Sequence, residues 1–354
     1  MRKTVFLIVG AAMLVPCTTS DSSYAQARAS RAIERNDRDG DGKISRDEWR
    51  KPGRIFRKID GDGDGYISLQ ELRARFGETT ATPSGDKSTT LAEGQVRQSE
   101  IDEFTLCAMG RGFGCTMKPA IERGLFETGL RPRFPSNADC RDIDEQWAIP
   151  YTWKRNRESY HGGIDMPAPW ETPIIAAADG TVIGKFRGEN NPRGVEIVLR
   201  HSPVDTGLPV WTFTQYTHFS DLPKQKLGQR VHLGEVLGPT GNTGISIKTG
   251  QQSEKRRPAI HFGVFFNSTG KYAALPRKII PANGHWMDPN ALYRNKGPFD
   301  SKSLKALPRV AKKTPVAILF EDGEKSLPNA KIVWPYRCKR QIEIESNSEL
   351  ENED

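Results

Sequence analysis

Residues 161–166 read HGGIDM, and they open the stretch of sequence that decides the fold of the larger part of this chain. Beyond them, short runs rich in β-branched and aromatic residues recur, with Gly, Pro or Asn clusters between the runs. Short strands separated by turn residues are typical of antiparallel sheets. This part of the chain is therefore predicted to be an antiparallel all-β domain. The runs cover residues 173–178, 181–186, 195–200, 210–218, 236–239 and 260–266.

Further motifs follow HGGIDM in order along the same stretch. They are PAP at 167–169, AADGTV at 177–182, YTHFS at 216–220, LGQRV at 227–231, GPTGNTG at 238–244 and IHFGV at 260–264. In this order and at these separations the motifs resemble the lysostaphin-type, or LytM-like, zinc endopeptidases of bacterial cell walls. The resemblance covers about residues 145–292. No single motif is specific for this family, but the whole series in this order is.

The resemblance implies one zinc ion bound by His161, Asp165 and His261 in a groove of the sheet. Two imidazoles and one carboxylate make a three-ligand catalytic zinc shell that leaves a position open for water. Gly162 and Gly163 allow the chain to pass close to the metal. Zinc in such a shell acidifies water and polarises a carbonyl, so the implied reaction is hydrolysis of peptide bonds in peptidoglycan.

His218 matches the family histidine that orients the water or stabilises the oxyanion. The last motif departs from the family, which usually has His-x-His where this chain has Ala259-Ile260-His261. Ala259 can neither donate to an oxyanion nor move a proton. His218 and the three metal ligands remain, however, so an active or weakly active zinc endopeptidase is predicted, and two alternatives stay open. One is a noncatalytic or weakly active module that binds peptidoglycan or regulates a cell-wall amidase, and the other is a calcium-dependent assembly protein.

The remaining histidines and nucleophiles have no comparable context. His201, His232 and His285 lack motif support and are expected at surface or turn positions. No Ser or Cys lies in a nucleophile elbow, and the sequence has no phosphate-binding loop. A serine or cysteine hydrolase and a nucleotide-dependent enzyme are therefore disfavoured.

Two copies of one acidic pattern lie between residues 29 and 76. DRDGDGKIS runs from residue 37 and DGDGDGYIS from residue 60, each followed by a glutamate at position twelve. Carboxylates at positions one, three and five, Gly at six, a backbone carbonyl at seven and a bidentate Glu at twelve form an oxygen cage for a hard cation. The loops resemble EF-hand calcium loops. The implied ligands of two Ca²⁺ ions are Asp37, Asp39, Asp41, Lys43 and Glu48, and Asp60, Asp62, Asp64, Tyr66 and Glu71.

The EF-hand pair is predicted to form a small all-α domain over residues 28–76. Ile44 and Ile67 occupy position eight of each loop and are expected to pair across a short two-stranded bridge. Without a cation the facing carboxylates would repel one another. The pair can either respond to changes in calcium concentration or hold calcium permanently as a structural ion. The structural role is preferred, because calcium outside the cytoplasm can keep weak sites filled.

The first 27 residues have the composition of an export signal. A basic pair precedes the apolar run 5–16, which is too short to span a bilayer, and small residues lead to a predicted cleavage after Ala27. Cys17 raises a lipoprotein alternative, which Pro16 disfavours because a small residue normally precedes a lipidated cysteine. The mature protein is therefore predicted in the periplasm or at the bacterial envelope, with no transmembrane segment.

Four cysteines remain after removal of the signal: Cys107, Cys115, Cys140 and Cys338. An exported chain meets an oxidising compartment, and no Cys-x-x-Cys spacing suggests a metal site, so disulfides are predicted. Four cysteines allow three pairings. Cys107 with Cys115 is favoured because the two flank a Gly-rich turn close in sequence, which leaves Cys140 for Cys338.

The other segments complete a multidomain arrangement. Residues 77–98 are rich in Thr, Ser, Gly, Pro and Ala and are predicted to form a flexible linker. A strand at 316–320 and the apolar residues 332–334 predict that part of the tail packs back on the body, and the acidic end is predicted to be disordered. Residues 99–148 form a Cys-containing connecting region with a short helix near 101–109, residues 149–292 the LytM-like domain, and residues 293–354 the tail.

Composition limits the function classes and partners. The chain has 354 residues and a net charge of +8, with 36% hydrophobic residues and a mean hydropathy of −0.61. These values exclude a polytopic membrane protein and a coiled-coil rod. The positive charge favours anionic wall polymers. Nucleic acid is excluded as a partner, because the basic residues are dispersed and the chain is predicted to be exported.

Overall fold

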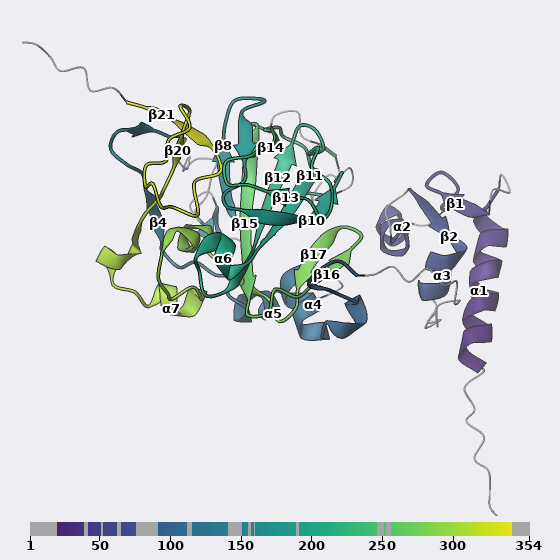
Figure 1. Cartoon of the computed structure of the whole chain (residues 1–354). Helices are drawn as coiled ribbons and strands as arrows, with labels where there is room; N and C mark the ends of the chain where they lie inside the picture. The colour runs from purple at the N-terminus through teal and green to yellow at the C-terminus, as the bar shows by residue number, and fades with distance from the viewer. Residues whose placement is uncertain are drawn as a thin grey trace, which may run out of the picture. The chain divides into compact units, whose positions relative to one another are not determined.

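The computed structural model describes residues 20–38, 42–50, 52–61, 65–75, 91–111, 115–140, 151–154, 157–158, 160–188, 191–245, 251–252 and 256–341. The chain divides into two compact units, Met1–Thr89 and Thr90–Asp354. Figure 1 shows the elements of both units, which are described separately below. Among the described residues, none of the helices is long and apolar enough to cross a membrane.

The N-terminal unit packs short helices around a small two-stranded sheet. Ile44 and Ile67 are direct antiparallel partners in this sheet, as predicted, and both are fully buried. Trp49, Phe56 and Leu72 surround them in the core. The described elements are α1 (Ser20–Asn36), β1 (Lys43–Ser45), α2 (Gly53–Ile59), β2 (Tyr66–Ser68) and α3 (Leu69–Arg75).

The predicted signal peptide is only partly covered, because residues 1–19 lie outside the described residues. Helix α1 begins at Ser20 and continues through the predicted cleavage position after Ala27. Among the described side chains of α1, Ala29, Ala32 and Ile33 join the core, and they follow that position.

The C-terminal unit is built on a seven-stranded sheet whose described strand pairs are antiparallel (Figure 1). The strand order is β13-β10-β11-β12-β15-β18. Strand β8 pairs with the first part of β15, residues 259–262, and β18 pairs with the later part, residues 264–266. The prediction of an antiparallel all-β domain is confirmed. The strands are β8 (Ile164–Pro167), β10 (Gly180–Phe186), β11 (Val195–His201), β12 (Trp211–Phe219), β13 (Arg230–Val231), β15 (Ala259–Asn267) and β18 (His285–Met287).

Smaller ribbons and helices surround this sheet. β9 (Pro173–Ile175) pairs with β14 (Val236–Pro239), and β6 (Trp153–Lys154) with β7 (Arg157–Glu158). β16 (Tyr272–Leu275) pairs with β17 (Lys278–Pro281) and, in parallel, with β3 (Gln95–Val96). The helical elements here are η1 (Gln98–Glu100), α6 (Pro203–Thr206), η2 (Pro289–Tyr293), α7 (Ser301–Lys305) and η3 (Arg309–Lys312).

Strand β3 lies within residues 77–98, the predicted linker, of which residues 77–90 are outside the described part of the chain. Its parallel pairing with β16 places the last residues of that segment in the C-terminal unit. A two-residue strand carries no hydrophobic periodicity, so its pairing with a strand far along the chain could not be read from local sequence.

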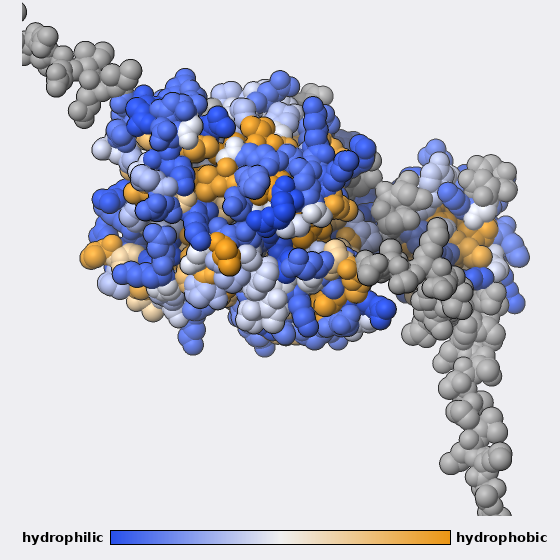
Figure 2. Space-filling model, in the orientation of Figure 1, coloured by the Kyte–Doolittle hydropathy of each residue, from blue (hydrophilic) through white to orange (hydrophobic). Residues whose placement is uncertain are grey.

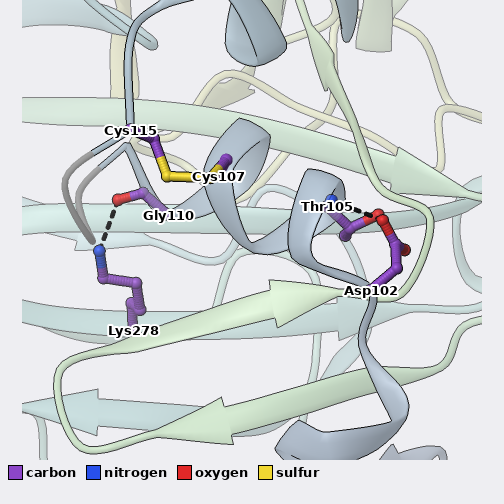
Figure 3. Close-up of a disulfide and its surroundings, with 6 residues drawn as sticks. All are labelled: Asp102, Thr105, Cys107, Gly110, Cys115 and Lys278. Carbon is purple, nitrogen blue, oxygen red and sulfur yellow. Dashed lines mark hydrogen bonds between the residues drawn. A yellow bond between two sulfur atoms is a disulfide. The ribbon is translucent and has the colours of Figure 1, made fainter.

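The connecting region is part of the same hydrophobic core as the sheet, and Figure 3 shows its disulfide. Helix α4 (Glu103–Gly110) begins at Asp102, whose Oδ1 accepts from the Thr105 N–H at 2.8 Å. Cys107 and Cys115 form the predicted disulfide, and Lys278 donates to the Gly110 carbonyl. Helix α5 (Lys118–Glu122) follows. The predicted helix near 101–109 is thus present, and it supports the sheet.

The tail packs on the body as predicted. Cys338 is joined to Cys140, and Trp334 and Tyr336 are fully buried in the main core. The acidic end beyond residue 341 lies outside the described residues. The strands involved are β4 (Arg131–Arg133), β5 (Ala138–Asp139), β19 (Lys313–Pro315), β20 (Leu319–Phe320) and β21 (Arg337–Arg340). The face of the molecule seen in Figure 2 is mainly hydrophilic, with smaller hydrophobic patches between.

Candidate metal centre

Three side chains from separate sequence motifs bring their donor atoms together in the C-terminal unit. His261 Nδ1 lies 2.9 Å from His161 Nε2 and 2.9 Å from Asp165 Oδ1. His161 Nε2 and Asp165 Oδ1 are also 2.9 Å apart. The structure therefore places the three residues predicted as zinc ligands in a single cluster that could hold a metal ion.

Strand register explains why these residues meet. His261 on β15 and Asp165 on β8 are direct partners of an antiparallel pair, and such partners project from the same face of a sheet. His161 lies four residues before Asp165, where the chain approaches β8. Gly162 and Gly163 follow His161, and the sequence predicts that they let the chain pass close to the metal.

Both glycines are indeed closely packed. A Cβ at Gly163 would lie 2.4 Å from the carbonyl oxygen of Phe262 and 2.8 Å from Nε2 of His261. A Cβ at Gly162 would lie 2.2 Å from the ring of Trp286. A larger residue at Gly163 would push the His161 segment away from β15, and one at Gly162 would displace the Trp286 ring or the segment itself.

The donor set suits a divalent metal. Asp165 and His261 are only 4% and 8% exposed, and burial of a carboxylate is costly without a partner charge. Nδ1 of His161 is buried and has no hydrogen-bond partner among the described residues. Donor atoms in a tetrahedral zinc shell with bonds of about 2.0 Å lie roughly 3.3 Å apart, close to the spacing seen here. Two imidazoles and one carboxylate therefore fit zinc in both chemistry and spacing.

His218 reaches this cluster through a β-bulge. The β11–β12 register shifts between Val195 and Glu196, which pair with Phe219 and Thr217 and leave His218 as the extra residue. Its φ is +69°, in the left-handed region. Thr217 is the direct partner of His261, and strict alternation would turn residue 218 to the other face. The bulge instead brings the His218 ring to 6.2 Å from the His261 ring, between centroids.

The His218 ring is held in one tautomer. Nδ1 lies 2.7 Å from the carbonyl oxygen of Thr243, which can only accept, so Nδ1 carries the proton. Nε2 then has the free electron pair, and it accepts from Nη2 of Arg256. Burial, followed by the charge of Arg256, holds the pKa of His218 well below its ordinary value, although Asp165 opposes this shift. An Nε2 that accepts from a guanidinium carries no proton, so the contact with Arg256 selects the neutral imidazole.

Arg256 was not anticipated from the sequence. Its Nη1 lies 3.4 Å from the Thr243 carbonyl oxygen, and its own carbonyl accepts from Asn242 Nδ2 at 2.9 Å. A basic residue close before the last motif was the available signal, but only the folded loops bring it to His218. Ala259, three residues later, is buried on β15 opposite Pro167.

Residues of the connecting region contact the side chains that pack beside His161. Trp286, which packs on Gly162, donates from Nε1 to the carbonyl oxygen of Ala108 on α4 at 3.0 Å. The Arg111 guanidinium lies 4.8 Å from the centroid of the Trp286 ring and donates to the Tyr160 carbonyl, next to His161. Residues outside the predicted LytM-like domain therefore help to position His161.

The predicted calcium loops are formed in the N-terminal unit as far as they are described. The Gly42 N–H donates to Asp37 Oδ2 at 2.9 Å, and the Ser45 N–H donates to Glu48 Oε2 at 2.7 Å. The second loop repeats the latter contact between Ser68 and Glu71 at 2.8 Å. Asp39, Asp41, Asp62 and Asp64 lie outside the described residues.

Buried carboxylates in these loops fit a cation. Glu48 and Asp60 are 6% and 7% exposed, and a cation offsets the cost of burying such charges. Lys43 and Tyr66 occupy the seventh loop positions at the start of β1 and β2, where backbone carbonyls are the expected ligands.

His201 differs from its prediction as a surface or turn residue. It is fully buried at the end of β11, with Nδ1 2.5 Å from the Asp179 carbonyl oxygen and Nε2 2.7 Å from Thr214 Oγ1. These two contacts satisfy both ring nitrogens, which the local sequence did not reveal. His232 is exposed, and His285 is half-buried beside Phe266.

Family comparisons agree with the two units. Residues 159–272 match the model of peptidase family M23, and residues 33–51 and 54–76 each match an EF hand. The M23 match contains His161, Asp165, His218 and His261.

Curated relatives match the same region. Over 98 residues the chain is 35% identical to the DD-carboxypeptidase/endopeptidase Mpg of Neisseria meningitidis serogroup B, covering 28% of this chain and 19% of that protein. Over 132 residues it is 30% identical to the peptidoglycan DD-endopeptidase ShyA of Vibrio cholerae, covering 37% and 26%. The chain thus spans a fifth to a quarter of the length of these relatives.

A solved structure of the antimicrobial peptidase lysostaphin from Staphylococcus simulans is 27% identical, covers 31% of this chain and 38% of its own, and has a TM-score of 0.24. The assignment to a family rests on the family-model matches and not on this structural likeness. The chain contains two EF-hands followed by a domain of peptidase family M23.

Proposed function

We propose that this protein is an exported, zinc-dependent endopeptidase that hydrolyses peptide bonds of bacterial peptidoglycan. The observation that carries the proposal is the convergence of His161 Nε2, Asp165 Oδ1 and His261 Nδ1 at mutual distances of 2.9 Å. A zinc ion bound by these atoms supplies a Lewis acid that makes water more nucleophilic and polarises the scissile carbonyl. The names of the Neisseria and Vibrio relatives support peptidoglycan as the substrate.

His218 acts as the general base and acid in this proposal. Its Nε2 electron pair can take a proton from the attacking water and return it to the leaving amine. The Thr243 carbonyl fixes the ring by accepting from Nδ1, which leaves Nε2 as the nitrogen that can accept that proton.

The EF-hands bind two calcium ions and lock the N-terminal unit. Support comes from the buried carboxylates Glu48 and Asp60 and from the paired bridge of Ile44 and Ile67. The place of action is the periplasm or the cell envelope, supported by the apolar N-terminus, by the two disulfides, and by the wall-directed relatives.

Ala259 favours a second candidate. A family histidine is replaced by a methyl group, which is consistent with a noncatalytic module that binds peptidoglycan and regulates a cell-wall amidase. In that case the groove docks the polymer and leaves its bonds intact.

Digestion of purified peptidoglycan separates the two candidates. The mature protein is incubated with peptidoglycan, its zinc content is measured, and a His261→Ala variant is run in parallel. Release of shortened peptides by the wild type alone supports the peptidase. A wild type that contains zinc and releases no peptide contradicts it, and amidase activity is then measured with and without the protein.

A further inference from the structure

The site has an unusual cation next to its neutral histidine. Arg256 donates from Nη2 to His218 Nε2, and its Nη1 lies 3.4 Å from the Thr243 carbonyl oxygen. That carbonyl also accepts from His218 Nδ1 at 2.7 Å. The guanidinium and the imidazole therefore share one anchor, which fixes their positions relative to each other.

The backbone of Arg256 is held in place as well. The Arg256 carbonyl accepts from Asn242 Nδ2 at 2.9 Å, and Thr243 Oγ1 donates to the Phe219 carbonyl at 2.7 Å. These contacts join the Arg256 segment to the 240–244 loop and that loop to the end of β12. The guanidinium is therefore held beside the end of the strand that carries His218.

Among the described residues, Arg256 forms no salt bridge. In the described part of the chain no carboxylate lies within ion-pair distance of its guanidinium, and its direct side-chain partner is a neutral imidazole. Burial lowers the pKa of Arg256, and the negative charge of Asp165 opposes that shift. Arginine stays charged in proteins, so the site keeps a cation that suits an oxygen anion.

The alanine at position 259 leaves a function that a cation at Arg256 can fill. The resembling family has a histidine there, and in this chain the position offers only a buried methyl group. Hydrolysis of an amide places negative charge on the carbonyl oxygen, and loss of a donor to that oxygen costs about 10²–10³ in rate. A guanidinium has five N–H donors, and two contacts to His218 and Thr243 leave others for a substrate.

We propose that Arg256 is a catalytic residue that donates to the negatively charged oxygen of the scissile carbonyl, in place of the histidine missing at position 259. This inference rests on the proposed peptidase function. As the water oxygen bonds to the carbonyl carbon, the C=O electron pair moves to the oxygen that Arg256 contacts. His218 Nε2, released by Arg256, takes the proton of the water. When the C–N bond breaks, the proton passes to the leaving nitrogen, and an amine and a carboxyl group result.

Kinetics of Arg256 variants test the role directly. Arg256→Ala is expected to lower kcat about 100-fold or more with KM changed less than about threefold, because the lost contact forms in the transition state. Arg256→Lys keeps the charge and is expected to recover part of the rate. Arg257→Ala, at the adjacent exposed arginine, is the matched control and should stay within about twofold of the wild type. Zinc content and melting temperature are measured for each variant.

Restoring the histidine gives a second test. Ala259→His is expected to raise kcat at least about tenfold in the Arg256→Ala background and to change the wild type much less, since the two donors serve one oxygen. A folded, zinc-containing Arg256→Ala variant with wild-type kcat overturns the proposal. So does an equal gain from Ala259→His in both backgrounds.

Binding of inorganic phosphate separates this inference from the peptidase proposal. Calorimetric titration of the zinc-loaded protein with phosphate is expected to show about tenfold weaker binding by Arg256→Ala than by the wild type or Arg257→Ala. If the wild type releases no peptides, the proposed function fails, and this titration still decides whether Arg256 binds an oxygen anion. Equal phosphate affinities in all three proteins overturn the anion-binding role.

Discussion

His261 and Asp165 are direct partners across the β15–β8 pair, with Nδ1 and Oδ1 2.9 Å apart. The β-ladder sets this distance, because the hydrogen bonds of the pair fix both Cα positions and the shared face. The third residue of the cluster, His161, comes from the segment that enters β8. The geometry of the candidate metal centre is thus largely a property of the sheet.

Asp165→Asn is expected to lower zinc affinity at least about tenfold and to reduce peptide release at least about 100-fold, because a neutral amide replaces the anionic ligand while the shape is kept. Zinc is measured by elemental analysis after dialysis against a chelator of graded strength. Asp179→Asn, on a half-exposed carboxylate, serves as a control. Zinc retention equal to wild type in Asp165→Asn would show that the carboxylate is not a ligand.

His218→Asn is expected to reduce kcat about 100-fold or more while zinc content stays at the wild-type level. Asparagine tolerates the φ of +69° at this bulge better than most residues, so the backbone should be preserved. Peptide release and the melting temperature are measured together. A decrease in kcat below about fivefold, with the fold intact, would contradict a proton-transfer role.

His201→Gln is expected to reduce the acid sensitivity of the fold. Burial lowers the pKa of His201 to about 4, so the unfolded chain binds its proton first and folding stability falls as pH falls from about 6.5 to 4. The contribution lost over this window is about 3 kcal/mol. Urea unfolding at pH 7 and pH 4.5 of both proteins measures it. Parallel pH dependence in the two proteins would refute the assignment to His201.

Removal of the Cys140–Cys338 disulfide is expected to destabilise the C-terminal unit. The bridge joins residues 198 positions apart, and a cross-link over so long a loop stabilises by up to about 5 kcal/mol through the unfolded state. The double variant Cys140→Ser/Cys338→Ser is compared with Cys107→Ser/Cys115→Ser, whose separation is 8. Thermal unfolding should show the larger loss for the first pair, and the reverse order would contradict the argument.

Glu71→Gln and Glu48→Gln are each expected to lower the calcium stoichiometry from two to one, since each removes a bidentate ligand. Isothermal titration of the whole protein with calcium measures the stoichiometry. Glu34→Gln, on the exposed side of α1, is the control. Two full calcium sites in Glu71→Gln would disprove the assigned ligand.

The sequence by itself determined the segments and their chemistry. Runs rich in β-branched and aromatic residues between turn clusters located β10, β11, β12 and β15 of the sheet but not the shorter β8, β13 and β18. The ordered motifs singled out His161, Asp165 and His261. The repeated carboxylate pattern did the same for the EF-hand loops, because those ligands lie within one short loop. Local patterns of this kind suffice when the structure they specify is itself local.

Only the tertiary structure decided the contacts between distant segments. The bulge that turns His218 toward His261 depends on how β11 pairs with β12, and Arg256, which lies in none of the motifs, meets His218 only in the folded chain. His201 is buried because Asp179 and Thr214 satisfy its ring, and α4 supports the metal-ligand segment through Trp286. Strand register and loop packing are cooperative properties of the whole sheet, so no window of sequence contains them.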